Sequence, residues 1–358
     1  MNWEQYEVAF TNKNLELKRF SQVELEAKLD YAKNIYKNKV PIIYDVKHLS
    51  KLIGVKYSEL YKISNSNSKF YYKEFLLPKN NGGERKIKAP LPTLNIIQKW
   101  IFHNILEHLN CSVYCKSYQK NVSLKDNAKF HRRQSVLMKL DISNFFDEID
   151  TKLIYNIFRE LGYSEEISAT VTKLVMYTDN KKTKGIPQGA TTSPMLSNIV
   201  LKKFDEKVGH FCLEHKIRYT RYADDLAFSG DFDFIKLKAF VGKELLENGF
   251  TLNKRKTKIL QRNNRQIITG IVVNEKMQVS RKYRKNLRLE IHYLISQTQQ
   301  HFNHKNLNTD KQKLMYLKTV VGKVNFVLQV NSLDNEFKNY KKEIYKIIDS
   351  INSSVPQT

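Results

Sequence analysis

The chain has 358 residues, of which 61 are Lys or Arg and 36 are Asp or Glu, so its formal net charge is +25. Such an excess of positive charge is typical of proteins that bind nucleic acid or an anionic membrane surface. No apolar run approaches the ~20 residues that span a bilayer, and no basic segment followed by an apolar core opens the chain, so we expect a cytoplasmic protein. The cysteines at 111, 115 and 212 form no Cys-x-x-Cys pair, which argues against a disulfide framework or a zinc module.

The order of predicted elements indicates a mixed fold. Residues 1–40 have helical apolar spacing and carry 7 Lys/Arg against 6 Asp/Glu, so the basic character belongs to the rest of the chain. A helix-turn-helix rhythm follows over 45–64, and a polar tail closes the chain over 352–358. Predicted strands lie at 69–77, 85–90 and 136–142, with a turn at 79–84. Predicted hairpins lie at 219–229 and at 267–279, the second interrupted by Gly270. Predicted helices lie at 93–109, 151–161, 165–177, 193–212, 234–248 and after 280. We therefore expect an α+β protein with an antiparallel sheet and a helical C-terminal part.

The stretch Tyr222-Ala223-Asp224-Asp225 places two adjacent carboxylates between apolar and aromatic residues, which suits a hairpin whose turn presents the acids. Partly buried carboxylates repel each other unless a cation neutralises them. Mg²⁺ binds carboxylate oxygens together with substrate phosphates. The pair therefore predicts a third acid elsewhere in the chain that completes a two-metal site.

Asp141 is the candidate for that third acid, because it ends the apolar strand over 136–142. Three carboxylates around two Mg²⁺ ions align a 3′-hydroxyl with a nucleotide α-phosphate and stabilise the pyrophosphate leaving group. Acidic turns are common, so a solvated turn explains either acidic motif taken alone. The loop Gly185–Pro194 lies between the two motifs, and its glycines allow close backbone approach to a ligand, although a plain connector has the same composition.

In this order and spacing, Asp141 with Phe145-Phe146, the loop Gly185–Pro194 and the stretch Tyr222–Asp225 resemble palm motifs A, B and C of reverse transcriptases. The resemblance covers about residues 45–340 and implies a right-hand fold of fingers, palm and thumb. It implies RNA-templated DNA synthesis from deoxynucleoside triphosphates with two Mg²⁺ ions. The implied domains are an N-terminal helical extension (1–44), fingers (45–135), a palm with part of the fingers interleaved (136–265), and a motif E hairpin with a helical RNA-binding thumb (266–358).

The same resemblance implies roles for single residues. The catalytic metal ligands are Asp141, Asp224 and Asp225, and Lys256 matches a motif D lysine that protonates pyrophosphate, with a solvated lysine as the alternative. The implied nucleotide contacts are Arg85 and Lys86 on the triphosphate, with Lys88 as a competitor, Phe146 as a steric gate against a ribose 2′-hydroxyl, and Gln188 with Gly189 beside the nucleotide and template base.

Two further motifs narrow the family. The stretch Asn127–His131 fits the Asn-Ala-x-x-His signature of bacterial retron reverse transcriptases, and Ile268-Thr269-Gly270 resembles their Val-Thr-Gly signature, with Ile for Val. The retron resemblance implies a cognate structured non-coding RNA, priming from the 2′-hydroxyl of a guanosine, and a branched RNA–DNA product called msDNA. It also implies a role in antiphage defence with an effector protein, and we interpret residues 1–40 as packed on the body or as a contact for that effector or for oligomerisation.

The C-terminal part is the predicted RNA-binding region, because residues 281–358 hold 14 Lys/Arg against 6 Asp/Glu with aromatic residues interleaved. Basic side chains bind phosphate and aromatic rings stack on unpaired bases, although helix packing explains most of these rings. The predicted RNA contacts are Asn127, His131, Thr269, Gly270, Arg281, Lys282, Arg284, Lys285 and Arg288.

Three alternatives stay open. A reverse transcriptase from a group II intron, a diversity-generating system or an abortive-infection system shares the palm motifs. We expect a maturase-like region in the intron enzyme, and the two flanking signatures argue against the other two. A catalytically silent RNA-binding scaffold shares the fold but does not require all three acids. A basic membrane-surface protein requires a basic amphipathic helix with a strong apolar face, which the sequence lacks.

Overall fold

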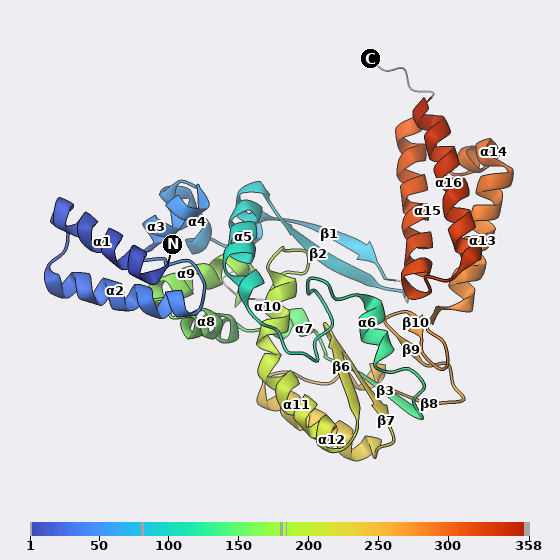
Figure 1. Ribbon diagram of the computed structural model, residues 1–358, viewed down its shortest axis with the longest axis horizontal. Coiled ribbons are helices and arrows are strands. Elements are labelled where there is room, and N and C mark those ends of the chain that lie inside the picture. Colours follow the sequence, from blue (N-terminus) through green and yellow to red (C-terminus); the bar gives the residue numbers. More distant parts are fainter. Residues whose placement is uncertain (1, 80–81, 180–181, 184, 354–358) are drawn as a thin grey trace.

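The computed structural model describes residues 2–79, 82–179, 182–183 and 185–353, so parts of the predicted turn at 79–84 and of the polar tail at 352–358 lie outside the described residues. The N-terminal helices lie at one end of the molecule, a sheet lies in the middle, and four C-terminal helices stand together at the other end (Figure 1). Among the described helices, none is long and apolar enough to cross a membrane.

The first two helices differ in how they contribute to the core. A capping box closes each of them at its start, with Asn2 and Ser21 as the caps. Helix α1 buries no side chain, whereas α2 buries Leu25, Ala32 and Ile35. Elements up to residue 135 are α1 (Trp3–Leu17), α2 (Gln22–Lys37), α3 (Val46–Ile53), α4 (Tyr57–Asn65), η1 (Ser68–Tyr71), β1 (Tyr72–Pro78), β2 (Glu84–Pro90), α5 (Pro92–Asn104), η2 (Leu106–His108) and α6 (Leu124–Lys129).

Strands β1 and β2 form the predicted antiparallel ribbon, which projects from the body toward the C-terminal helices (Figure 1). The central sheet is antiparallel with strand order β6-β7-β3-β8. Elements of this middle part are β3 (Val136–Asp141), α7 (Phe145–Glu148), α8 (Thr151–Glu160), α9 (Glu165–Val175), β4 (Thr178–Asp179), β5 (Lys182–Thr183), α10 (Ser193–Val200), α11 (Lys202–Glu214), β6 (Arg218–Tyr222), β7 (Asp225–Gly230), α12 (Phe234–Glu247), η3 (Lys254–Lys256) and β8 (Lys258–Gln261).

The central sheet separates two hydrophobic clusters, because successive strand residues point to opposite faces. On β3, Met138 and Leu140 belong to the larger cluster, which reaches from α2 to α12. Leu137, the residue before Met138, points to the opposite face and belongs to the second cluster with the C-terminal helices. The remaining elements are β9 (Ile267–Ile268), β10 (Ile271–Val272), β11 (Gln278–Val279), α13 (Arg281–Ser296), α14 (Thr298–His304), α15 (Asp310–Val330) and α16 (Asn335–Ser353).

The predicted α+β class with an antiparallel sheet is confirmed, and two predicted elements are corrected. The helix expected over 193–212 is two helices, because the chain leaves helical geometry at Leu201 (φ −89°, ψ 7°). The β-branched Ile199 and Val200 just before the break lower helix propensity. The hairpin expected over 267–279 has three short strands instead, since Thr269 and Gly270 both have positive φ, as a tight type I′ turn requires. The proposed domain boundaries stay a prediction.

Candidate active site

The end of β3 and the turn between β6 and β7 bring three carboxylates to one edge of the sheet. Strands β3 and β7 pair so that Asp141 lies directly opposite Asp225. The Ile142 N–H donates to the Asp224 carbonyl oxygen at 3.0 Å, which ties the turn to the end of β3. The backbone register thus makes Asp141, Asp224 and Asp225 neighbours at this edge of the sheet, and their role as metal ligands stays a prediction.

The negative charge of this group is only partly balanced by its surroundings. Burial raises the pKa of Asp224, and the Asp141 and Asp225 carboxylates raise it further. Burial likewise raises the pKa of Asp225. The Lys256 ammonium lies 2.9 Å from Oδ2 of Asp141, and this contact raises the pKa of the lysine. The other oxygen, Oδ1 of Asp141, is buried without a hydrogen-bond partner.

The three acids fit a divalent cation by their chemistry, because carboxylate oxygens are preferred ligands and a cation relieves their mutual repulsion. The buried, unbonded Oδ1 of Asp141 is a ready ligand atom. Within the described part of the chain, however, no three His, Cys, Asp or Glu side chains are already gathered as an ion would need. Lys256 supplies the positive charge at Asp141 instead, so ion binding requires the acids to close together and Oδ2 to be shared or released.

The loop Gly185–Pro194 lies between the segment after Asp141 and the β1–β2 ribbon. Gly185 has φ +70°, and a Cβ atom there would lie 2.1 Å from the Phe146 carbonyl oxygen. That same oxygen accepts the Ile186 N–H at 2.9 Å. On the other side of the loop, the Lys88 N–H donates to the Gln188 carbonyl oxygen at 2.7 Å. The loop is therefore fixed against both neighbours.

The residues predicted to contact the nucleotide have different environments. Phe146 is half-buried, with the Phe145 ring 5.6 Å away in an edge-on arrangement. Arg85 is exposed, and Lys86 forms a 2.7 Å ion pair with Glu74. Lys88 is only 8% exposed, and its ammonium lies 3.8 Å from the centroid of the Tyr177 ring. Arg85 and Lys86 are thus more accessible to a triphosphate than their competitor, and these roles stay predictions.

The RNA contacts predicted at Asn127 and His131 need correction, because both side chains are buried, with exposed fractions of 2% and 0%. The Thr220 hydroxyl donates to Oδ1 of Asn127 at 2.6 Å. His131 bridges β6 and β7, with Nε2 2.7 Å from the Thr220 hydroxyl and Nδ1 2.7 Å from the Ser229 hydroxyl. Burial lowers the pKa of His131 from 6.5 to about 3, so the ring is neutral at physiological pH. These two residues brace the hairpin that carries the twin acids.

Two predicted RNA contacts on α13 form ion pairs within the C-terminal helices. Arg284 Nη1 lies 2.7 Å from Oδ2 of Asp334, and the Arg288 guanidinium donates to both carboxylate oxygens of Glu336. These pairs tie α13 to the start of α16. Five other predicted RNA contacts stay predictions, namely Thr269 and Gly270 in the β9–β10 turn and the exposed Arg281, Lys282 and Lys285 on α13.

The sequence reasoning missed a fully buried ion pair behind the acid turn, in which Arg221 Nη2 lies 2.6 Å from Oδ2 of Asp205. One signal was available, because residues two apart on a strand share a face and Arg221 shares its face with the buried Tyr219. A charged side chain at an inward position predicts a buried partner. The sequence does not say which of many acids that partner is.

The sequence model of the family described as "Reverse transcriptase (RNA-dependent DNA polymerase)" matches residues 77–298, which include the three acids and the loop between them. The chain belongs to the reverse transcriptase family. This reverse transcriptase is similar to curated retron enzymes. It is 27% identical to the Retron Ec86 reverse transcriptase of Escherichia coli, over 72% of this chain and 80% of the relative. It is 31% identical to the Retron Mx65 reverse transcriptase of Myxococcus xanthus, over 62% of this chain and 56% of the relative.

These matches confirm the predicted resemblance to retron reverse transcriptases. The reverse transcriptase spans only 56% of the length of the Mx65 relative. Among solved structures, it is similar to telomerase from Candida albicans in complex with the TWJ fragment of telomeric RNA, at 13% identity and a TM-score of 0.45, over 79% of this chain and 64% of that chain. The family generally uses divalent metal ions, which agrees with the chemistry of the three acids.

Proposed function

We propose that this reverse transcriptase polymerises deoxynucleotides on an RNA template with two Mg²⁺ ions held by Asp141, Asp224 and Asp225. The observation that carries the proposal is the β3–β7 register, which sets Asp141 opposite Asp225 and beside Asp224. When bound, the ions supply activation of a 3′-hydroxyl and stabilisation of the leaving pyrophosphate. Two observations support it. Burial and neighbouring carboxylates raise the pKa of Asp224 and Asp225, which a bound cation would oppose, and Oδ1 of Asp141 is a buried ligand atom without a hydrogen bond.

Other residues of the chain then bind the nucleotide and transfer the proton to the leaving group. Lys256 keeps its proton, because the acids raise its pKa, and its ammonium lies beside Asp141, where it can protonate the leaving pyrophosphate. Arg85 and Lys86 bind the triphosphate from the ribbon, and Phe146 excludes a ribose 2′-hydroxyl. Gln188 and Gly189 support the base. In this proposal residues 45–135 are the fingers, 136–265 the palm and 266–358 the RNA-binding thumb, with 1–44 as an extension.

The test is primer extension on an RNA template with deoxynucleotides and Mg²⁺. The double variant Asp224→Asn/Asp225→Asn should extend the primer more slowly by at least roughly 10²–10³-fold, because it lacks carboxylates that hold the ions which stabilise the transition state. Asp231→Asn is a matched control, since this exposed acid follows the end of β7. Equal incorporation by the wild type and the double variant would refute the catalytic assignment.

We further propose that the template is a cognate structured non-coding RNA, primed from a guanosine 2′-hydroxyl to give branched msDNA, within an antiphage system that includes an effector protein. The retron relatives and the exposed Arg281, Lys282 and Lys285 support the RNA partner. Helix α1 supports a protein partner, because it buries no side chain and leaves Val8 and Leu15 exposed at 59% and 67%.

Sequencing of the nucleic acid that co-purifies with the protein tests the retron part of the proposal. We expect a short DNA joined 2′–5′ to a structured RNA. An active polymerase that yields no branched product would instead favour a reverse transcriptase of another bacterial system.

A further inference from the structure

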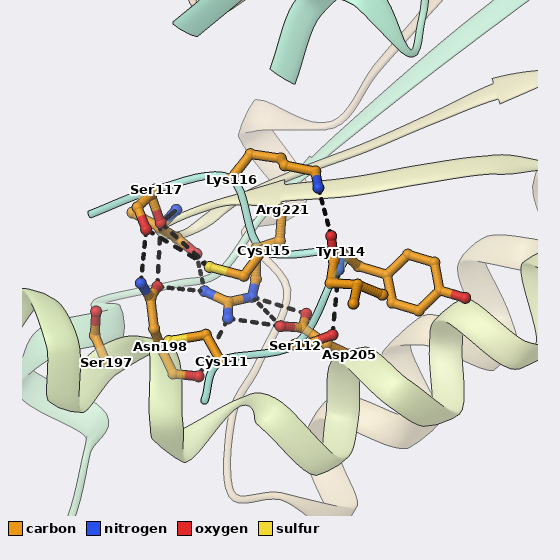
Figure 2. A network of polar contacts seen from close by, with 12 residues as sticks. Cys111, Ser112, Tyr114, Cys115, Lys116, Ser117, Ser197, Asn198, Asp205 and Arg221 are labelled. Carbon is orange, nitrogen blue, oxygen red and sulfur yellow. Dashed lines mark hydrogen bonds and ion pairs between the residues drawn. The ribbon is translucent and has the colours of Figure 1, made fainter. Parts of the chain in front are cut away.

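A buried ion pair lies behind the turn that presents Asp224. Arg221 on β6 and Asp205 on α11 are both fully buried. The Arg221 guanidinium donates to the Asp205 carboxylate, from Nη2 to Oδ2 at 2.6 Å and from Nε to Oδ1 at 2.8 Å (Figure 2). A buried ion pair adds little net stability, because desolvation of the two charges offsets their attraction. The pair is therefore better explained by a geometry that it fixes than by strength that it adds.

The same guanidinium reaches the acid turn through a closed ring of polar groups. Arg221 Nη1 donates to the Ala223 carbonyl oxygen at 3.1 Å and to Oδ1 of Asn198 at 3.3 Å. Asn198 and Ser117 bond each other twice, at 2.7 and 3.1 Å (Figure 2). The Ser117 hydroxyl accepts the Ala223 N–H at 2.9 Å, which closes the ring. Both backbone polar groups of Ala223 are thus bonded to side chains of this ring.

Ala223 needs such support, because its φ of +54° lies in the left-handed region. That conformation costs an L-residue about 1–2 kcal/mol. Ala223 directly precedes Asp224 and Asp225, so its backbone sets the direction in which the turn presents both acids. Asn198 lies on α10, which follows the loop Gly185–Pro194, so the ring also ties the acid turn to the nucleotide side of the site.

We propose that Arg221 is a positioning residue for polymerisation, which holds Ala223 in its left-handed conformation through the ring and thereby orients Asp224 and Asp225. The inference rests on the proposed function. Arg221 touches neither substrate nor metal in this role, and its effect passes through the turn.

The main test variant is Arg221→Lys, which keeps the charge but cannot bond Asp205, Asn198 and Ala223 with one planar fork. Ser117→Ala is a milder variant, because it removes the acceptor for the Ala223 N–H and leaves the ion pair in place. Arg218→Lys is the matched control, since this exposed arginine lies on the same strand. The measurements are kcat and KM for deoxynucleotide in primer extension, the melting temperature, and the Mg²⁺ concentration that gives half of the melting shift.

We expect kcat to fall by about 10- to 100-fold in Arg221→Lys and Ser117→Ala, because small displacements of reacting groups cost up to about 10²-fold. The Mg²⁺ midpoint should rise in both variants, whereas Arg218→Lys should match the wild type. Adding Ala223→Gly to Arg221→Lys should restore part of kcat, because glycine adopts positive φ without the penalty. A purely structural role predicts lower melting temperatures but no such rescue.

The inference is overturned if Arg221→Lys keeps the kcat and the Mg²⁺ midpoint of the control, or if Ala223→Gly restores no activity. A wild type that extends no primer would refute the proposed function instead. In that case the Mg²⁺ midpoints of the wild type and Arg221→Lys still test the orientation of the acids, and equal midpoints overturn the inference.

Discussion

Asp224 and Asp225 in the β6–β7 turn lie beside Asp141 despite the repulsion between carboxylates, and this makes the stability of the protein depend on pH. Burial and neighbouring charge raise the pKa of Asp224 and Asp225 above the values of the unfolded chain. At pH values between the ordinary and the raised pKa, the folded protein therefore binds protons that the unfolded chain has released. The metal-free protein should gain stability from these acids as pH falls through their raised pKa values and lose it as pH rises to neutrality.

Asp224→Asn removes one of the repelling charges and keeps the shape of the side chain. Without metal, near neutral pH, we expect the variant to be more stable than the wild type by roughly 0.5–2 kcal/mol, as at other strained functional sites. Mg²⁺ should raise the melting temperature of the wild type but not that of the variant. Differential scanning fluorimetry in EDTA and in Mg²⁺ measures both effects, with Asp231→Asn as the control. A variant that melts at or below the wild type in EDTA contradicts the expectation.

The site was predictable from sequence where the signals were local. An apolar strand that ends in Asp141 and a hairpin turn at Asp224-Asp225 are each visible within a few residues. The partners of His131 and Arg221 were not predictable, because Thr220, Ser229 and Asp205 meet them only through the fold. The Asn-Ala-x-x-His signature consequently suggested a surface contact, whereas its Asn and His are buried.

The contact between the β1–β2 ribbon and the loop Gly185–Pro194 depends on a glycine. Gly189 has φ +114°, and a Cβ atom there would lie 2.7 Å from Cγ2 of Ile87 and 3.1 Å from the Lys88 carbonyl oxygen. A side chain at this position would push the loop from β2 and weaken the Lys88–Gln188 backbone bond. The close approach of loop and ribbon therefore requires glycine at 189.

Gly189→Ala should lower stability by about 1–3 kcal/mol through backbone strain and should also raise KM for deoxynucleotide. Gly249→Ala is a matched control, because Gly249 also has a positive φ, of +84°, but a Cβ atom added there would meet nothing within 4 Å. Both variants should have a lower melting temperature, but only Gly189→Ala should change KM for deoxynucleotide. Equal KM values in the two variants would show that the loop–ribbon contact does not support the nucleotide.

Most elements were predictable from periodicity, and the failures have local causes. The helix expected over 193–212 is interrupted at Leu201, where apolar spacing continues through the break and hides it. The interruption at Gly270 was expected, but not a tight turn that includes Thr269, because threonine rarely adopts the positive φ that it has here. In both places the hydrophobic pattern was right and the backbone conformation was not encoded in it.

The N-terminal extension has two parts with different consequences for the protein. Helix α2 places Ile35 in the main core, and the Tyr31 hydroxyl donates to the Ile43 carbonyl oxygen at 2.7 Å. Helix α1 is attached mainly through aromatic rings, such as Trp3 against Tyr36 with centroids 5.6 Å apart. The segment over 1–40 is therefore not one removable unit.

Deletion of residues 1–20 should leave DNA synthesis at the wild-type rate, because the contacts that it removes lie far from the acids. They are aromatic and cation–π contacts, worth about 0.5–1.5 kcal/mol for each aromatic pair, and the hydrogen bond between the Tyr6 and Tyr44 hydroxyls. It should abolish co-purification of a partner that binds α1. Deletion of residues 1–37 should destabilise the protein, since each buried aliphatic side chain lost costs about 2–5 kcal/mol. Primer extension, melting temperature and affinity purification distinguish these outcomes. Loss of synthesis in the shorter deletion would contradict the peripheral role of α1.

Strand β3 packs into both hydrophobic clusters, with Leu137 on one face and Met138 and Leu140 on the other. A strand of this kind stays packed on one face when the cluster on its other face is disrupted. If the C-terminal helices move when an RNA binds, the larger cluster still packs against β3. Asp141, at the end of that strand, would therefore keep its place even if the C-terminal helices changed position.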